Sequence, residues 1–348
     1  MPIAELPRRR RLIAAAGALA ALLALAGCAS DGADAGGPAS GGELLPAAEG
    51  VTQYPLTLET PFGETVLEER PERIAIVTAA TPETDSLIAL GGVPVLAPST
   101  VERNPWLDAA ALADVEELWE SQASEELSAE VIAAAEPDLI VNLQAYETFD
   151  QARFDQLKAI APVLYAPYSD ELSWQEKLRR VAEAVDLSGA AEKRIAETED
   201  AVASIAADHP EFAGRTATHV IVYEQEWGAA FASAPGSNTA KLFESLGFVT
   251  PPSAARFADD EEISDELIGL IDADFVLVST FGGDTADYFV DSPLFRAVPA
   301  VEDGRVAFNV QGEDDVANYV AWGLNQQSVL SVPWLLERFA GFAAEAMG

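Results

Sequence analysis

The chain has 348 residues, with 58 Asp and Glu against 20 Lys and Arg, so its formal net charge at pH 7 is −38. This balance excludes nucleic acid as the expected partner, because phosphate groups are bound by basic surfaces. The excess negative charge favours solubility, and it favours a neutral or cationic ligand over an anionic one. A single cysteine, Cys28, excludes an intramolecular disulfide.

Residues 1–27 are predicted to be an export signal. Four consecutive arginines precede a short apolar run that ends in the tetrapeptide LAGC at Cys28. This ending resembles the bacterial lipoprotein signal, in which the cysteine is lipidated and becomes the first residue of the mature chain. A structural cysteine behind an ordinary signal peptide is the alternative. Loss of residues 1–27 removes four Arg and one Glu, which brings the net charge to −41.

Residues 28–50 are expected to form a flexible tether, because this stretch is rich in Ala, Gly, Ser and Asp and has almost nothing to bury. The remaining residues, 51–348, suffice for two lobes of ordinary size. We assign 51–170 to an N-terminal α/β lobe, 171–209 to a connecting helix and 210–348 to a C-terminal α/β lobe.

Strands and helices alternate in the N-terminal lobe. The segment RIAIV at 73–77 has the β-branched, apolar character of a buried parallel strand. A helix should follow from Thr81, with Pro82 in its first position and Gly91 at its end. Similar signals continue to residue 167. The alternation predicts a parallel sheet that is covered by helices on both faces.

The segment 171–209 has no strand signal. Ser173 and Glu176 have the spacing of a capping box, and apolar residues follow at helical spacing on both sides of a Ser188-Gly189 break. Structureless loops of this length are uncommon, so a helical connector is predicted.

One sequence unit occurs in both lobes. LSAEVIAAAEPDLIVN begins at Leu127 and ISDELIGLIDADFVLVS begins at Ile263, so matching residues are 136 positions apart. In each copy we expect the Ser to cap a helix and the Asp to open a buried strand. The loops that follow, at 144–146 and 280–283, should face each other across a ligand cleft. An offset of this length suits a repeated lobe rather than a solenoid.

The mature chain resembles the lipid-anchored substrate-binding proteins of bacterial ABC importers for ferric siderophores, cobalamin and haem. The resemblance begins at about Glu69, and it is carried by the order and spacing of RPERIAIV, LSAEVIAAAEPDLIV, KAIAPVLY, LFESLGF, ISDELIGLIDADFVLV and SPLFRAVPAVEDGRVAFNV. It implies an α/β fold of two Rossmann-like lobes with parallel-type sheets joined by a long helix, a ligand held between the lobes, and little lobe closure.

The resemblance also implies partners. The protein would capture its ligand outside the membrane and deliver it to a permease, while a separate ATPase supplies the energy. We expect a monomer, exported and held on the outer face of the cell membrane only by the lipid on Cys28, with no other cofactor and no resident metal. In this family an acidic residue on the first helix of each lobe pairs with a permease arginine. Asp85, five residues before the Leu90 of a Leu-Gly helix end, holds that place in the first lobe. The same distance from the Leu246-Gly247 pair in the second lobe leads to Lys241, so Glu244, one turn further along the helix, is the candidate there. The alternative for Glu244 is a solvated helix face.

Ligand contacts are expected in the loops that follow the strands, because ligands of open α/β sheets bind beyond the carboxyl ends of the strands. Aromatic side chains in these loops suit a bulky, partly apolar ligand, with packing under their own loops as the alternative. The candidates are Arg103, Trp106, Tyr146, Tyr168, Trp227, Phe281, Tyr319 and Trp322.

A ferric siderophore of the hydroxamate type is the predicted ligand. Such a complex presents an apolar rim and oxygen acceptors, which aromatic and amide side chains suit and to which Arg103 could donate a pair of hydrogen bonds. Catecholate and citrate complexes are polyanionic and would require several Lys or Arg residues. Cobalamin and haem are the alternatives within the family, and a ligand-sensing lipoprotein is a more remote one.

An exported hydrolase is the alternative from the enzyme class. The motifs GxSxG and HExxH are absent, which favours a protein that is not an enzyme. The acidic run at 259–262 is more typical of a solvated face than of a glycosidase dyad or a calcium loop. Direct zinc or manganese binding would need clustered histidines, whereas His209 and His219 lie in different segments.

Overall fold

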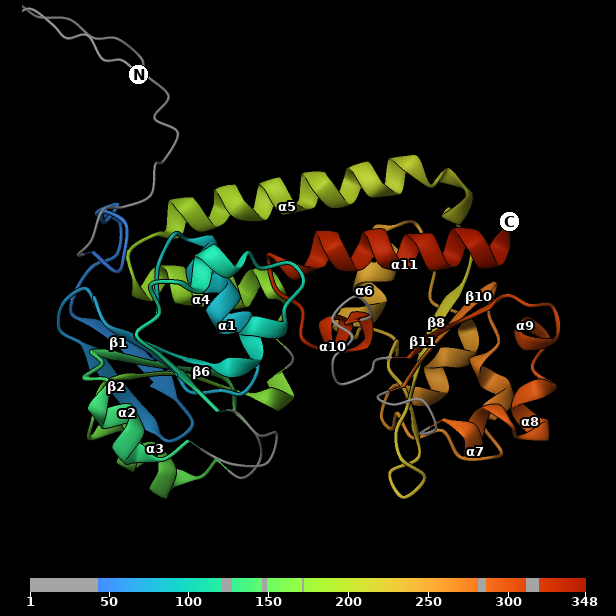
Figure 1. The fold of residues 1–348 in the computed structure, drawn as a ribbon, viewed down its shortest axis with the longest axis horizontal. Helices are drawn as coiled ribbons and strands as arrows, with labels where there is room; N and C mark the ends of the chain where they lie inside the picture. Colours follow the sequence, from blue (N-terminus) through green and yellow to red (C-terminus); the bar gives the residue numbers. More distant parts are fainter. Residues whose placement is uncertain (1–42, 121–126, 146–148, 171, 281–285, 311–318) are drawn as a thin grey trace, which may run out of the picture. The chain divides into compact units, whose positions relative to one another are not determined.

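A computed structural model describes residues 43–120, 127–145, 149–170, 172–280, 286–310 and 319–348 (Figure 1). Residues 43–348 form one compact unit. It contains one sheet of parallel strands, one sheet that is mostly parallel, and flanking helices, which confirms the predicted α/β class. No helix in the described part of the chain is long and apolar enough to cross a membrane.

The N-terminal sheet has five parallel strands in the order β5-β4-β3-β6-β7. The strands are β3 Ile74–Ile76, β4 Leu96–Pro98, β5 Glu117–Trp119, β6 Leu139–Ala145 and β7 Val163–Pro167, and a separate antiparallel pair is formed by β1 Leu56–Thr60 and β2 Gly63–Leu67. Successive residues of β6 enter different cores. Leu139 and Val141 pack with the face covered by α1 (Pro82–Ala89), whereas Ile140 packs with the face covered by α2 (Ala129–Ala134) and α3 (Gln151–Lys158). Both faces are buried, as the alternation predicted.

The C-terminal sheet has the order β11-β10-β8-β9. Its strands are β8 Ala217–Val222, β9 Ala229–Phe231, β10 Phe275–Thr280 and β11 Val306–Val310, and its helices are α6 Asn238–Ser245, α7 Asp287–Val290, α8 Pro293–Arg296, α9 Pro299–Glu302, α10 Val320–Asn325 and α11 Ser331–Met347. The edge strand β9 pairs antiparallel with β8, so this sheet is mixed rather than wholly parallel. Pro333 lies in the first turn of α11, where a proline removes no hydrogen bond of the helix.

The connector consists of two helices, α4 (Trp174–Ala184) and α5 (Ser188–Asp208). Ser173 and Glu176 form the predicted capping box at the start of α4. The chain turns between the helices at Asp186, which has a positive φ of 55°. Its carboxylate accepts hydrogen bonds from the backbone amides of Gly50, Val51 and Thr52 at 2.7 to 2.8 Å, so the break is fixed by the segment that precedes the first strand.

Residues 43–50 therefore differ from the predicted tether. The carboxylate of Glu49 accepts hydrogen bonds from the amides of Gly189 and Ala190 at the beginning of α5, at 2.6 and 2.8 Å. Leu45 is buried in the hydrophobic core. The folded unit begins at Glu43 because these side chains satisfy the exposed amide groups of a helix start, a role that composition alone does not reveal.

The Asp residue of the repeated sequence unit makes similar hydrogen bonds in both copies. Asp138 precedes β6 and accepts hydrogen bonds from the amides of Glu72 and Arg73, just before β3. Asp274 precedes β10 and accepts hydrogen bonds from the amide and hydroxyl of Thr216, just before β8. In both lobes one carboxylate therefore joins the starts of two neighbouring parallel strands.

The two copies differ at the Ser. Ser128 caps α2 through a hydrogen bond from the amide of Val131. The prediction of a capped α-helix after Ser264 is wrong, because the chain forms a turn there and then a single 3₁₀ segment at Ile268–Ile271. Ile268 and Ile271 are both buried at a spacing of three residues, which suits the tighter helix.

One hydrophobic core extends through both lobes. It combines one face of each sheet with residues of α4, α5, α6 and α11, and α5 lies beside α11 (Figure 1). Phe243 of α6 stacks on Phe339 of α11 with ring centroids 4.0 Å apart, and Phe275 of β10 meets the same ring edge-on. The lobes are therefore packed against common helices rather than attached by a flexible segment.

Candidate functional site

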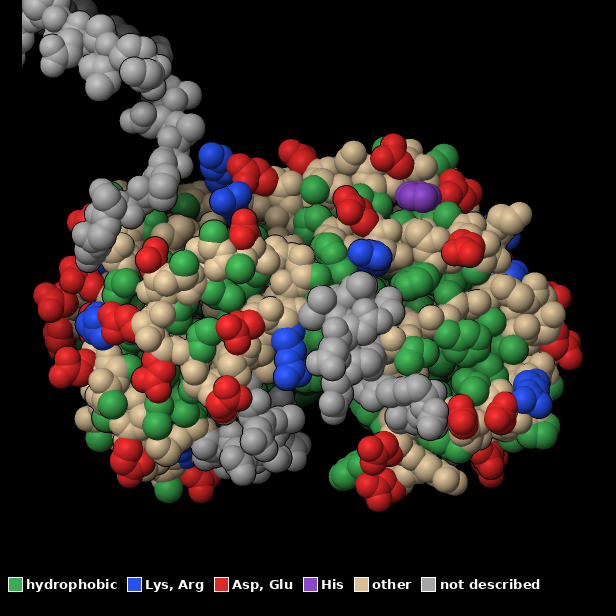
Figure 2. All heavy atoms as spheres, viewed as in Figure 1, with side chains coloured by type: hydrophobic (Ala, Val, Ile, Leu, Met, Phe, Trp, Pro, Cys, Tyr) green, Lys and Arg blue, Asp and Glu red, His purple; other side chains and the backbone are tan. Residues whose placement is uncertain are grey.

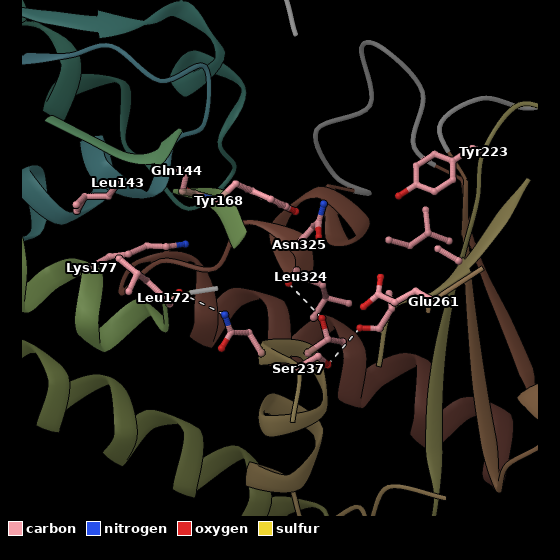
Figure 3. A pocket seen from close by; sticks show the side chains of 15 residues that line it. Leu143, Gln144, Tyr168, Leu172, Lys177, Tyr223, Ser237, Glu261, Leu324 and Asn325 are labelled. Atoms are coloured by element: carbon pink, nitrogen blue, oxygen red, sulfur yellow. Dashed lines mark hydrogen bonds between the residues drawn. The ribbon is translucent and has the colours of Figure 1, made fainter. Parts of the chain in front are cut away.

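A pocket of about 230 Å³ lies between the lobes (Figure 3). Both lobes supply its lining. The N-terminal lobe and α4 contribute Leu143, Gln144, Tyr168, Leu172 and Lys177, and the C-terminal lobe contributes Tyr223, Ser237, Glu261, Leu324 and Asn325.

The strand topology explains why these residues meet. Gln144 lies near the carboxyl end of β6, Tyr168 follows β7 directly and Tyr223 follows β8 directly. Parallel strands place their carboxyl ends at one edge of a sheet, where ligands of open α/β folds bind. The pocket therefore lies at the edge of the sheets to which the carboxyl ends of these strands point.

Lys177 is the one cationic group among the described residues that line the pocket. It belongs to α4, its residue surface is only 5% exposed, and its amine points from the helix into the cavity (Figure 3). Burial lowers the pKa of the Lys177 amine, and the charge of Glu83 opposes that shift. Glu83 belongs to α1 and has no exposed surface. Burial raises the pKa of the Glu83 carboxyl, and Lys177 opposes that shift in turn.

The C-terminal lobe supplies a carboxylate, Glu261, to the described lining of the pocket. Its carbonyl accepts a hydrogen bond from the amide of Phe231 at 2.8 Å, which fixes its position beside β9. Its exposed side chain points into the cavity from the side opposite Lys177 (Figure 3). Burial, and secondarily the charge of Glu261, raise the pKa of Tyr223. The pocket therefore has a cation in one wall and an anion in the other.

The predicted ligand residues occupy different places. Tyr168 lines the pocket and is 41% exposed. Trp227 is 75% exposed in the turn between β8 and β9 and does not line it. Tyr146, Phe281 and the predicted lipidation site Cys28 lie outside the described residues.

The other four predicted residues lie together, but not in this pocket. Trp106 and Tyr319 have ring centroids 6.1 Å apart, and those of Tyr319 and Trp322 are 6.4 Å apart. Arg103 is exposed nearby; burial raises the pKa of Tyr319 and the charge of Arg103 opposes it. These residues form an aromatic group between the loop after β4 and the start of α10.

This aromatic group borders Asp85, the predicted docking residue of the first lobe. Asp85 has no exposed surface, and its carboxylate accepts hydrogen bonds from Asn104, Trp106 and Ser328 at 3.3, 2.8 and 2.6 Å. Burial raises the pKa of Asp85 to about 7, although the three hydrogen bonds favour the ionised form. An arginine of a partner would reach this carboxylate only after Trp106 or Ser328 had moved.

Glu244, the docking candidate of the second lobe, is exposed. It lies on α6 and accepts a hydrogen bond from the hydroxyl of Thr250 at 3.0 Å. Its carboxylate is accessible to a partner without rearrangement.

Sequence reasoning missed Lys177, Glu83 and Glu261. Lys177 follows Trp174 by three residues and precedes Val181 by four, so it shares the buried stripe of α4. A charged residue within an apolar stripe indicates a buried charged group, and this pattern could have identified Lys177 from the sequence.

A family model described as "Periplasmic binding protein" matches residues 76–309. The curated protein "Ferric enterobactin-binding periplasmic protein FepB" of Escherichia coli O6:H1 is 27% identical over 279 residues, which cover 75% of this chain and 85% of the relative. "Probable siderophore-binding lipoprotein YfiY" of Bacillus subtilis is 26% identical over 275 residues, covering 75% and 80%.

Solved structures show the same fold. The structure of PiaA of Streptococcus pneumoniae in complex with ferrichrome superposes with a TM-score of 0.67 at 21% sequence identity, covering 84% of this chain and 98% of that one. At a sequence identity of 21%, this structural similarity is evidence for a shared fold alone.

Proposed function

Because the chain belongs to the periplasmic binding protein family, we propose that it is the substrate-binding component of an ABC iron importer and that its ligand is a ferric siderophore. The family consists of binding proteins, and the chain is not an enzyme. The observation that carries the proposal is the polar pocket between two α/β lobes that share one core. Support comes from two relatives, one named as a binding protein for ferric enterobactin and the other as a probable siderophore-binding lipoprotein.

We further propose a hydroxamate complex as the ligand class. Among the described residues that line the pocket there is one Lys and one Glu, whereas a polyanionic catecholate or citrate complex requires several cations. The phenol of Tyr168 and the amides of Gln144 and Asn325 suit the oxygen acceptors of a hydroxamate shell. Acidic side chains are spread over both lobes in the face that Figure 2 shows, which disfavours the approach of an anion.

The pocket volume indicates how such a ligand would bind. Pockets for drug-sized ligands typically measure about 300 to 1,000 Å³. The pocket of about 230 Å³ is smaller, so it suits one face of a ferric complex with the rest in the open cleft.

Membrane attachment and delivery belong to the same proposal. Lipid on Cys28 would hold the exported protein on the membrane, an arrangement in agreement with the word lipoprotein in the name of the Bacillus relative. A permease with its ATPase would receive the ligand, with the exposed Glu244 as a docking group. Asp85 would dock only after Trp106 or Ser328 had moved.

A ligand titration tests the proposed function. Residues 29–348 are titrated with ferrioxamine, ferrichrome, ferric catecholates, cobalamin and haem while tryptophan fluorescence is recorded. We expect saturable quenching by the ferric hydroxamates and recovery of each ligand unchanged. Tighter binding of a catecholate would contradict the hydroxamate class, and preferential binding of cobalamin or haem would contradict the siderophore assignment itself.

A further inference from the structure

The amine of Lys177 has an unusual environment for a lysine. Among the described residues, no carboxylate oxygen lies within 4.0 Å of it, and it has no hydrogen-bond partner. A mostly buried lysine that has no acceptor from the protein depends on water or a ligand for its hydrogen bonds. The amine of Lys177 is directed into the pocket, where either can reach it (Figure 3).

Glu83 stabilises the charged form of this amine without closing over it. One Glu83 oxygen accepts a hydrogen bond from the backbone amide of Leu143 at 3.2 Å, and the other has no hydrogen-bond partner among the described residues. Helices α1 and α4 pack together, and the charges of Glu83 and Lys177 each favour the ionised form of the other. Glu83 does not line the pocket, whereas the amine of Lys177 points into it (Figure 3).

Gln144 adds a second group that is incomplete in this state of the pocket. It is buried, it lines the pocket close to Lys177, and its side-chain oxygen has no hydrogen-bond partner among the described residues (Figure 3). Unpaired buried polar atoms are uncommon in native proteins and mark places where a ligand or water completes the hydrogen bonding. The N-terminal wall therefore presents the amine of Lys177 as a donor and the side-chain oxygen of Gln144 as an acceptor to a polar ligand.

The opposite wall has the opposite charge. Glu261 faces Lys177 across the pocket from the C-terminal lobe, and the phenol of Tyr223 lies on the same wall (Figure 3). A ligand that bridges the pocket meets an ammonium group at one end and a carboxylate at the other. Electrostatic complementarity then favours a ligand with an anionic oxygen face and a cationic arm.

We propose that Lys177 and Glu261 are specificity-determining residues that select a ferric hydroxamate carrying a free ammonium arm, with the amine of Lys177 donating to the metal-bound oxygens and the carboxylate of Glu261 receiving the arm. This inference rests on the proposed siderophore function. The inference adds to that function the charge pattern of the ligand and the two residues that recognise this pattern.

A matched pair of ligands tests the role of Glu261. Ferrioxamine B has a free ammonium arm, and its N-acetyl derivative is the same ferric complex without that charge. We expect the wild-type protein to bind ferrioxamine B about 3- to 10-fold more tightly than the derivative. Glu261→Gln should abolish this preference, because the ammonium arm then has no carboxylate to pair with. Equal wild-type affinities, or a preference that survives Glu261→Gln, would overturn the assignment of Glu261.

The role of Lys177 is tested with both ligands. Lys177→Met should weaken binding of each by about 10- to 100-fold, because the lost hydrogen bond is charge-assisted. Lys193→Met, on the exposed side of α5, is the control for net charge and should bind as the wild type does. Unchanged affinity of Lys177→Met for both ligands would overturn the assignment.

A double variant separates ligand binding from a purely structural role. Lys177→Met alone leaves Glu83 buried without its counter-charge and is at risk of misfolding. In Glu83→Gln/Lys177→Met both charges are absent, so the pair is neutral. We expect this protein to fold and still to lose about 10- to 100-fold in affinity; wild-type affinity would show that Lys177 serves only Glu83. If the wild type bound no siderophore at all, the proposed function itself would fail.

Discussion

The hydroxyl of Ser328 donates a 2.6 Å hydrogen bond to the carboxylate of Asp85, although 243 residues separate them in the chain. Asp85 belongs to α1 of the N-terminal lobe, and Ser328 precedes α11 of the C-terminal lobe. Both residues are buried. The bond therefore joins the lobes at a point that is shielded from water, where hydrogen bonds to charged groups are strongest.

Ser328→Ala should destabilise the folded protein. The substitution leaves Asp85 with one fewer donor and removes the acceptor for the amide of Ser331, so we expect a loss of about 1 to 3 kcal/mol in the free energy of unfolding. Urea denaturation measures it. Ser245→Ala on the exposed end of α6 is the control and should cost less than about 0.5 kcal/mol. Equal losses in the two variants would contradict a special role for the inter-lobe bond.

Asp85 should make stability depend on pH. Its pKa is about 7 in the folded protein, raised from 3.8 by burial, so between these values the folded chain holds a proton that the unfolded chain has released. The contribution of Asp85 to stability is therefore fully present below about pH 4, falls by about 1.4 kcal/mol per pH unit as pH rises toward 7, and is constant above it.

Asp85→Asn isolates this contribution, since other titrating groups, Glu83 among them, act in both proteins. The difference in unfolding free energy between the variant and the wild type should shift in favour of the variant as pH rises from about 4 to about 7. Urea denaturation at intervals across this range gives the difference. Two parallel stability curves would show that Asp85 does not titrate in this window.

The capping box at the start of α4 should be worth a measurable part of the stability. The hydroxyl of Ser173 accepts a hydrogen bond from the amide of Glu176, whose carboxylate accepts one from the amide of Ser173. We expect Ser173→Ala to cost about 0.5 to 2 kcal/mol in thermal or urea unfolding. Ser204→Ala, exposed in the middle of α5, should be neutral or slightly stabilising, because Ala is the better helix former there. A neutral Ser173→Ala would contradict the cap.

Cys28→Ser should release the full-length protein from membranes. Serine cannot take the thioether-linked lipid, so the variant should appear in the soluble fraction of fractionated cells, whereas the wild type should sediment with the membranes. Ser30→Ala, two residues further on, should fractionate as the wild type does. Wild-type sedimentation of Cys28→Ser would refute lipid anchoring at this residue.

Local sequence signals predicted local structure well. Gly91 predicted the end of α1, and Gly247 holds the same place after α6. The two glycines have φ values of 80° and 94°, which side chains with a Cβ adopt at a cost. The failed prediction after Ser264 has an equally local reason. Gly269 interrupts this copy, whereas the Ala-rich first copy continues as an α-helix.

The site was harder to predict because it depends on burial. Asp85 was interpreted as a surface acid, yet neighbouring elements enclose almost every residue of α1. Lys177 lies in the segment predicted to be a helical connector, yet it lines the pocket. Helical periodicity tells which residues share a face, but the neighbours of that face are set by tertiary packing.

The common core of the two lobes has a consequence for communication with a transporter. Because α5, α6 and α11 bury apolar surface from both sheets in one cluster, we expect a single cooperative transition in calorimetry rather than one for each lobe. Large changes of the angle between the lobes would expose that surface and are therefore costly. A transporter would then recognise the loaded state by contacts with the ligand and with the side chains at the mouth of the cleft. A large change in the shape of the whole protein would not be needed.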